Sequence, residues 1–383
     1  MQTVVRAGAR ELIAYAFYDL GYRPRESLVL VGVQGLPGGR ERAHGCVLRV
    51  DLPAAPAAAR ELAAGVAGYL RSVGQRRVVA LVLSAAHDAP GGGSTAGEGA
   101  GGARPAHAGL VDDLTRILRR SGVVVSEALA VGSSSYRSYR CPRHGCCPPG
   151  GRPLGDLSTT AVAAAMVVAG QVLHDDEQGL VLDVDPEVTD GGEPADRADI
   201  RASDADQAAA GPGGALAALA RWRALTAPPP SGTGSAAMRP GPGHDPDLRW
   251  LEVALRAVEF RDALILTLVP GSGSAAERLL SGPGGHAGDA PSHRLLDTAP
   301  DPALLERGRV PLAHVARTAP PGHRAQALAV LAWMAWWSGA GARARLLARR
   351  ALEDEPGHRM ALVLDQLLLR GVPPVWALRE AAS

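Results

Sequence analysis

Three of the four cysteines in the chain lie in one short segment, SSSYRSYRCPRHGCCPPGG, which runs from Ser133 to Gly151. This segment contains side chains that zinc prefers as ligands, namely Cys141, His144, Cys146 and Cys147. Successive side chains tend to diverge, so a zinc site here would use two or three of these residues together with a distant ligand. The distant candidates are Cys46, His87, His107 and His174.

Two other interpretations of these cysteines stay open. They could be structural thiols packed in a turn, or they could form a disulfide or redox site. The segment directly follows a predicted strand, and ligands bind at the carboxyl edge of open α/β sheets. The sequence therefore predicts a functional or structural loop at that edge without deciding among the three roles.

Just before the cysteines, tyrosines alternate with arginines, at Tyr136, Arg137, Tyr139 and Arg140. Such residues stack on bases or hold phosphate groups, and they also commonly pack on one another at a surface. The formal net charge is +1, so no overall field attracts nucleic acid. We therefore do not expect a nucleic-acid partner.

The chain contains no lysine and no asparagine, while alanine, glycine, arginine and proline are abundant. This composition is typical of a very GC-rich genome. The absence of lysine excludes a Schiff-base enzyme, a Walker A phosphate loop and a kinase-type lysine. Any anion site must use arginine, backbone N–H groups or helix N-termini.

The elements that position these residues are short apolar runs alternating with helical patterns. The predicted strands are Ser27–Val33, Gly45–Leu52, Arg77–Ser84 and Val123–Val131. The predicted helices between them are Pro56–Val73 and His107–Gly122. Strands separated by helices imply crossover connections, so we expect an α/β fold with a mainly parallel sheet and flanking helices.

Three parts of the chain differ in composition. We expect an α/β domain with the Cys-rich loop over residues 1–175, and a helical segment with flexible linkers over residues 176–245. The acidic linker is Asp183–Arg201 and the Pro/Gly-rich linker is Ala227–His244. An all-helical domain follows over residues 246–383.

The end of the chain predicts a hairpin of tetratricopeptide type. Its small residues Ala332, Ala344 and Ala351 precede Pro356 at the spacing of that repeat. The predicted helices are Arg324–Ser338, Ala342–Glu353 and Met360–Leu369. This unit could bind a protein partner through the C-terminal helices, or could complete a helical core.

The cellular location is predicted from the apolar segments. The N-terminal segment, residues 1–24, has the pattern of an amphipathic helix rather than a signal peptide. The apolar run Ala327–Trp337 is shorter than the roughly 20 residues that span a bilayer. We expect a cytoplasmic protein that does not interact with membranes.

Four segments together resemble an actinobacterial family, domain-of-unknown-function family 4192. They are ELIAYAFYDLGYRPRESLVLVGV, LRVDLP, SYRSYRCPRHGCCPPGG and ALEDEPGHRMALVLDQLLLRGVPP, in this order over nearly the whole chain. The resemblance implies a set of recurring positions rather than a reaction. These positions are Gly21, Arg23, Pro24, Ser27, the pair Arg49 and Asp51, Ser138, Tyr139, Cys141, Cys146, Cys147 and Pro148. After the third strand the chain has SAAHDAP and retains only Asp88 of the acidic run expected there.

Three functions are compatible with the sequence. The first is a non-catalytic binding or scaffold protein. The second is an enzyme that acts on a phosphorylated or nucleotide substrate at the carboxyl edge of the sheet. The third is a thiol-based redox or zinc-dependent sensor. The candidate ligand-binding residues are Arg49, Asp51, Tyr136, Arg137, Ser138 and Tyr139, and the candidate metal or thiol residues are Cys141, His144, Cys146 and Cys147.

Overall fold

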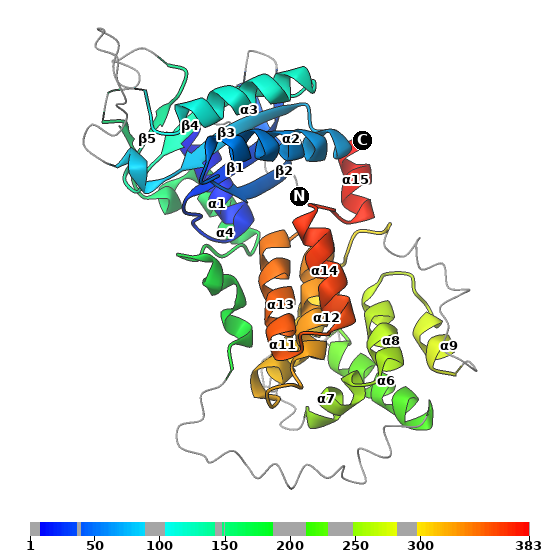
Figure 1. Cartoon of the computed structure of the whole chain (residues 1–383). Coiled ribbons are helices and arrows are strands. Elements are labelled where there is room, and N and C mark those ends of the chain that lie inside the picture. Colours follow the sequence, from blue (N-terminus) through cyan, green and yellow to red (C-terminus); the bar gives the residue numbers. More distant parts are fainter. Residues whose placement is uncertain are drawn as a thin grey trace. The chain divides into compact units, whose positions relative to one another are not determined.

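The chain folds into two compact units, which a computed structural model describes (Figure 1). The described residues are 8–36, 40–88, 104–141, 148, 150–186, 212–228, 248–281 and 297–382. The first unit extends to Leu180, and the second comprises Val181–Glu380. Within the described part, no helix is both long enough and apolar enough to span a membrane.

The first unit is a mixed α/β structure built on a six-stranded sheet. Its strands are β1 (Ser27–Leu36), β2 (Arg40–Asp51), β3 (Arg77–Leu83), β4 (Val124–Val131), β5 (Ser135–Ser138) and β6 (Arg152–Pro153). Its helices are α1 (Ala9–Leu20), α2 (Pro56–Ser72), η1 (Ala85–His87), α3 (Ala108–Arg120), η2 (Leu157–Thr159), α4 (Ala161–Val168) and η3 (Glu177–Val184), the last of which runs into the second unit.

The prediction of a mainly parallel sheet is wrong. The strand order is β2-β1-β3-β4-β5-β6, and only the pair β3–β4 is parallel. Three intervening residues join β1 to β2, and a short turn joins β4 to β5, so both pairs must be antiparallel. After α2 the chain returns to place β3 on the other side of β1 and antiparallel to it, so α3 is the one helical crossover that joins two parallel strands paired with each other.

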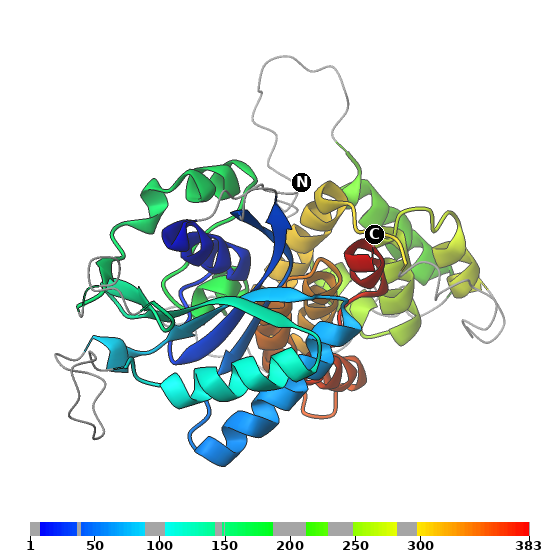
Figure 2. The same cartoon turned by 90° about the horizontal axis from the view of Figure 1, so that it is seen from above.

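Helices cover both faces of this sheet (Figure 2). Strand residues such as Val29 and Leu81 pack towards α1, and their neighbours such as Leu28 and Ala80 pack towards α2 and α3. The central strand β3 is buried at every position after Arg77. A central antiparallel strand covered on both faces is thus as continuously apolar as a parallel one, and apolarity alone could not distinguish them.

The second unit is helical. Its helices are α6 (Pro212–Thr226), α7 (Arg249–Leu255), α8 (Val258–Leu268), α9 (Ala275–Ser281), α11 (Pro302–Thr318), α12 (Ala325–Trp337), α13 (Gly341–Asp354), α14 (Arg359–Leu369) and α15 (Val375–Ala382). The all-helical C-terminal region and its three predicted helices are confirmed. The apolar run Ala327–Trp337 is the buried central helix α12, which contacts α11, α13 and α14.

The predicted acidic linker begins as ordered structure. Asp183 and Asp185 belong to a segment that arginine side chains of the second unit bind, so a flexible linker starting at Asp183 is wrong for these first residues. An acidic composition favours a solvated, flexible chain. It does not reveal that arginines more than a hundred residues away bind these acids in the folded protein. Residues 187–201 and most of the Pro/Gly-rich linker lie outside the described residues.

Candidate functional site

One edge of the sheet gathers the carboxyl ends of β2, β3 and β4. Ser27 at the start of β1 is the register partner of Asp51 on one side and of Leu83 on the other. Leu83 in turn pairs with Val131 at the end of β4. Residues that follow these strands therefore lie along a single edge, although the sheet is not mainly parallel.

The hydroxyl group of Ser84 is the centre of a polar cluster at this edge. It donates to Oε2 of Glu26 over 2.9 Å and accepts the N–H group of Ala86 over 3.2 Å. Nε2 of His107 lies 3.2 Å from the same oxygen. Because the serine proton points to a carboxylate, Nε2 of His107 must carry the proton of that contact. The hydroxyl then uses its full bonding capacity, and Ser84 is only 6% exposed.

Both partners of this hydroxyl have unusual backbones. Among the described residues, Glu26 (φ 41°) and His107 (φ 61°) are the two non-glycine residues with positive φ. Side chains other than glycine rarely adopt this region, and such residues concentrate where the surrounding structure holds a site in place. The carboxylate of Glu26 also accepts the N–H of Ala85 over 2.8 Å. The cluster thus fixes the turn after β3 from two sides.

Tyr139 and His87 extend the cluster towards β5. The hydroxyl of Tyr139 donates to the carbonyl oxygen of Ala106 over 2.6 Å and lies 3.4 Å from Nε2 of His87. The ring of His87 meets the rings of Tyr139 and His107 edge to face. Burial, together with the charges of His107 and Arg137, lowers the pKa of His87 to about 4. His87 is therefore neutral at pH 7, and burial raises the pKa of the Tyr139 phenol.

A groove of about 730 Å³ runs beside Tyr139, between α3 and the residues after β5. We call it the α3 groove. Asp112, Thr115, Arg116 and Arg119 recur at helical spacing on the face of α3 that lines it. The complete lining is Arg104, Val111, Asp112, Thr115, Arg116, Arg119, Arg120, Tyr139 and Arg140.

The arginines of the α3 groove differ in their partners. Arg104 binds Asp112 through two bonds of 3.0 Å. Arg140 donates to the carbonyl oxygen of Val125 over 2.6 Å, where β4 extends beyond its pairing with β5. Arg119 and Arg120 are exposed, and neither forms an ion pair with any other described residue. Arg119 and Arg120 are therefore the arginines of the groove that are best placed to bind an anion.

Arg49 and Asp51 lie at the same edge but on the other face of the sheet. They form an ion pair of 2.6 Å, and Nε of Arg49 donates to the hydroxyl of Ser27 over 2.9 Å. Position 49 is the partner of Val29, whose side chain packs towards α1, whereas Tyr139 packs towards α2 and α3. The structure therefore does not bring the predicted pair Arg49 and Asp51 together with Tyr139.

The remaining predicted ligand residues of β5 have different environments. Tyr136 is buried in the core on the α1 face. The hydroxyl of Ser138 donates to Glu127 over 2.8 Å and accepts the N–H groups of Arg140 and Cys141, so it shapes the turn that leads to the cysteines. Arg137 pairs with β4 and contributes to the low pKa of His87. Of the predicted set, Tyr139 is the side chain that both joins the polar cluster and lines the groove.

The cysteine hypotheses concern mostly undescribed residues. His144, Cys146 and Cys147 lie outside the described residues, and Cys141 is half-buried. Burial raises the pKa of Cys46 to about 11, which disfavours the thiolate that binds metals. No group of three or more candidate metal ligands occurs in the described part of the chain. The zinc and thiol roles stay predictions.

Comparison with known proteins gives one match. The sequence profile described as "Domain of unknown function (DUF4192)" matches residues 10–282 and 307–375. The chain belongs to this family. No curated protein and no solved structure is significantly similar to it. The DUF4192 match covers both units, including the polar cluster at the sheet edge and the α3 groove.

Sequence reasoning missed several residues of this DUF4192 site. Glu26, Ser84 and the arginines of α3 were not predicted, and His107 was considered only as a distant metal ligand. The arginine face of α3 was visible as helical spacing in DDLTRILRR. The contact between Glu26 and Ser84 had no local signal, because it depends on the antiparallel register of β1 and β3.

Proposed function

We propose that the first unit is a non-catalytic binding module for a phosphate-bearing small molecule, which it holds in the α3 groove. The observation that supports this proposal is the charge of the lining, with five guanidinium groups and a single carboxylate. That carboxylate, Asp112, already pairs with Arg104. Phosphate groups match guanidinium geometry, and the volume lies in the range of small-molecule sites.

The polar cluster supports binding rather than catalysis. A nucleophilic serine needs a histidine that accepts its proton, with an acid behind the histidine. Here the Ser84 proton goes to Glu26, and His107 is a second, separate partner of the same oxygen. The cluster therefore supports the groove wall at Tyr139 and leaves no free nucleophile.

Isothermal titration calorimetry with pyrophosphate and with adenosine diphosphate tests the proposal. We expect Arg119→Gln and Arg120→Gln each to weaken binding several-fold, roughly the 1 kcal/mol of one partly exposed charge contact. The matched control is Arg71→Gln on α2, an exposed arginine outside the groove. Equal affinities for the wild type and the two groove variants would contradict the site.

An enzyme acting on such a ligand is the alternative function. It is favoured by the left-handed backbones of Glu26 and His107, because strained residues cluster at active sites. The same samples, followed by ³¹P NMR over hours, distinguish the two. Release of phosphate by the wild type but not by Ser84→Ala would replace the binding module with an enzyme.

A second binding function is a protein partner for the C-terminal helices. We infer a tetratricopeptide-like hairpin in α12 and α13, which the complete burial of Ala332, Ala344 and Ala351 supports. Exposed Leu362, Val363 and Leu369 on α14 offer an apolar surface. Leu362→Asp with Leu369→Asp should remove partners recovered by affinity purification, whereas Val168→Asp, at the exposed C-terminal end of α4, should not.

We also propose a cellular location and a source for the protein. The unpaired thiol of Cys46 supports a reducing cytoplasm. The absence of lysine and asparagine supports a GC-rich actinobacterial source. Localisation of a fluorescent fusion in cells tests the first inference.

A further inference from the structure

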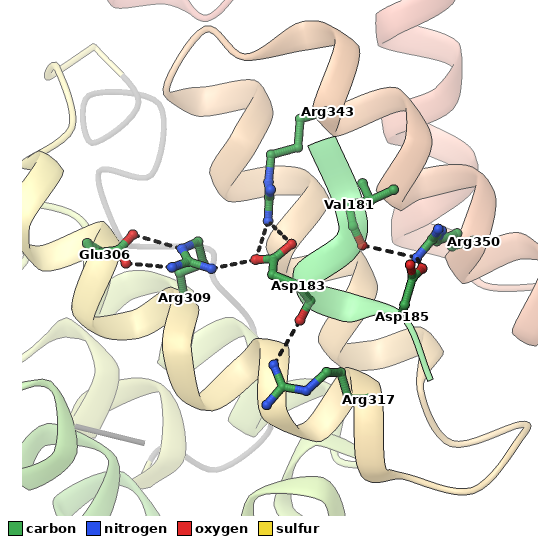
Figure 3. A network of polar contacts seen from close by, with 8 residues as sticks. All are labelled: Val181, Asp183, Asp185, Glu306, Arg309, Arg317, Arg343 and Arg350. Carbon is green, nitrogen blue, oxygen red and sulfur yellow. Dashed lines mark hydrogen bonds and ion pairs between the residues drawn. The ribbon is translucent and has the colours of Figure 1, made fainter. Parts of the chain in front are cut away.

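The second unit holds its own first residues in a cluster of arginines. The segment Val181–Asp185 lies against α11 and α13 (Figure 3). Val181 and Val184 are 0% and 2% exposed, whereas Leu182 between them is 59% exposed. Two apolar anchors thus alternate with acidic residues along a short chain segment.

Four arginines bind this segment, and we call them the arginine clamp. Arg309 and Arg317 come from α11, and Arg343 and Arg350 come from α13. The carboxylate of Asp183 accepts bonds from Arg309 and, over 2.8 and 2.9 Å, from Nη2 of Arg343.

The clamp also recognises the second acid and the main chain. Arg350 pairs with Asp185 at 2.5 Å and donates to the carbonyl oxygen of Val181 over 3.2 Å. Arg317 donates to the carbonyl oxygen of Asp183 over 2.9 Å. Bonds to both carboxylates and backbone carbonyls are the way in which proteins recognise an acidic peptide segment.

The bound segment is remote in sequence from the clamp. Each arginine is more than a hundred residues from the position it contacts, as for Arg309 and Asp183 with a separation of 126 residues. The ion-pair side chains are between about one fifth and two fifths exposed, so solvent reaches them. The contact is therefore a tertiary docking of the end of η3 and of Asp185 against α11 and α13.

We propose that the arginine clamp is a binding site for acidic segments of protein partners, and that residues 181–185 are its resident occupant. The partner segment carries two aspartates two positions apart, with a small apolar residue between them, as in Asp183-Val184-Asp185. A tethered occupant acts at an effective concentration in the millimolar range, so a partner must compete with it. The site is distinct from the α3 groove of the first unit and from the apolar surface of α14.

Fluorescence polarisation on the full chain tests this proposal. The probe is a labelled peptide with the sequence of Gly179–Pro186, GLVLDVDP. The double variant Asp183→Ser, Asp185→Ser loses the acidic groups of the resident segment. We expect it to bind the probe about ten-fold or more tightly than the wild type, whose clamp is occupied.

Two controls define the specificity. In the double variant, Arg343→Gln should weaken probe binding about ten-fold, whereas Arg359→Gln on α14 should leave it unchanged, since Arg359 is exposed and outside the clamp. The probe with both aspartates replaced by serine should not bind. Failure of the folded double variant to bind the acidic probe would overturn the proposal.

A second measurement uses the wild-type chain and does not depend on the variant. Hydrogen–deuterium exchange at residues 181–185 should accelerate when the acidic peptide is added in millimolar excess, because the displaced segment loses its protection. The serine peptide should have no effect. Unchanged exchange in the presence of the acidic peptide would show that the resident segment is a fixed part of the unit and would overturn the proposal.

Discussion

A single hydroxyl group, that of Ser84, links three segments of the first unit. It contacts Glu26 before β1, Ala86 in η1 and His107 before α3. Each contact is between residues far apart in the sequence except that to Ala86. The cost of the left-handed backbone at Glu26 and His107 is offset by these bonds, so the residues of the cluster act together rather than as separate functional groups.

His87 makes the stability of this cluster depend on pH. Burial lowers its pKa from 6.5 to about 4, so below pH 6.5 the unfolded chain takes up a proton that the folded chain does not. The free energy of unfolding is thus fully maintained above pH 6.5 and falls as the pH approaches 4. Thermal melts of His87→Gln should show a flatter dependence in this window than the wild type. Parallel profiles would contradict a neutral, buried His87.

Two substitutions at His107 test how much its left-handed backbone conformation costs in stability. At φ 61° a β-branched residue is disfavoured, whereas asparagine adopts this region readily. Both His107→Asn and His107→Val remove the imidazole, so their difference reports the backbone alone. We expect His107→Val to unfold in urea with a free energy about 1–2 kcal/mol lower than that of His107→Asn. Equal stability would mean that this turn changes conformation easily.

At the scale of elements, strands and helices end where partners from other elements satisfy their backbone groups. The carboxylate of Asp354, at the end of α13, accepts the N–H groups of Gly322, Arg324 and Ala325 over 2.7, 2.8 and 2.9 Å. It therefore caps the start of α12 from a neighbouring helix. Arg140 has the same role for β4, whose carbonyl at Val125 has a guanidinium as its partner.

The cap formed by Asp354 should contribute to the stability of the protein. Removing this charged acceptor leaves three N–H groups at and just before the start of α12 to water, so Asp354→Ala should lower the free energy of unfolding by about 2 kcal/mol. Glu353→Ala is the matched control, because Glu353 is an exposed neighbour on the same helix. Chemical denaturation measures both. Similar small losses for the two variants would contradict the capping role.

Two arginines that line the α3 groove should differ in their effect on the free energy of unfolding, measured by chemical denaturation. Arg140→Gln breaks bonds to main-chain carbonyls of β4 and should lower the free energy of unfolding by about 1–2 kcal/mol. Arg119→Gln removes an exposed charge with no ion-pair partner in the described part of the chain, so it should stay within about 0.5 kcal/mol of the wild type. A large loss for Arg119→Gln would indicate a structural rather than a ligand-binding arginine.

At the scale of the whole molecule, the sequence predicted the elements better than their arrangement. Apolar patterns located β3, α2 and α12 to within one residue at each end, because each of these elements buries most of its apolar side chains. The sheet order depends on which strands share hydrogen bonds, and apolar runs carry no signal of direction. The candidate site shows the same difference. Tyr139 could be predicted from the residues next to it in the sequence. Glu26 belongs to the site only because the antiparallel register of β1 and β3 brings it to Ser84.

The charge of the whole chain gives a last prediction. Forty basic and 39 acidic side chains nearly cancel, so the eleven histidines control the net charge near neutral pH. The range from pH 7.5 to 6 includes the ordinary pKa of a histidine side chain, about 6.5, so the net charge rises above +1 as the pH falls, and like-charged molecules repel one another. The second virial coefficient from light scattering should therefore increase over this range, and added salt should reverse the increase. Circular dichroism at each pH confirms that the fold persists, and a coefficient that stays constant or falls would show that specific contacts between molecules outweigh their net charge.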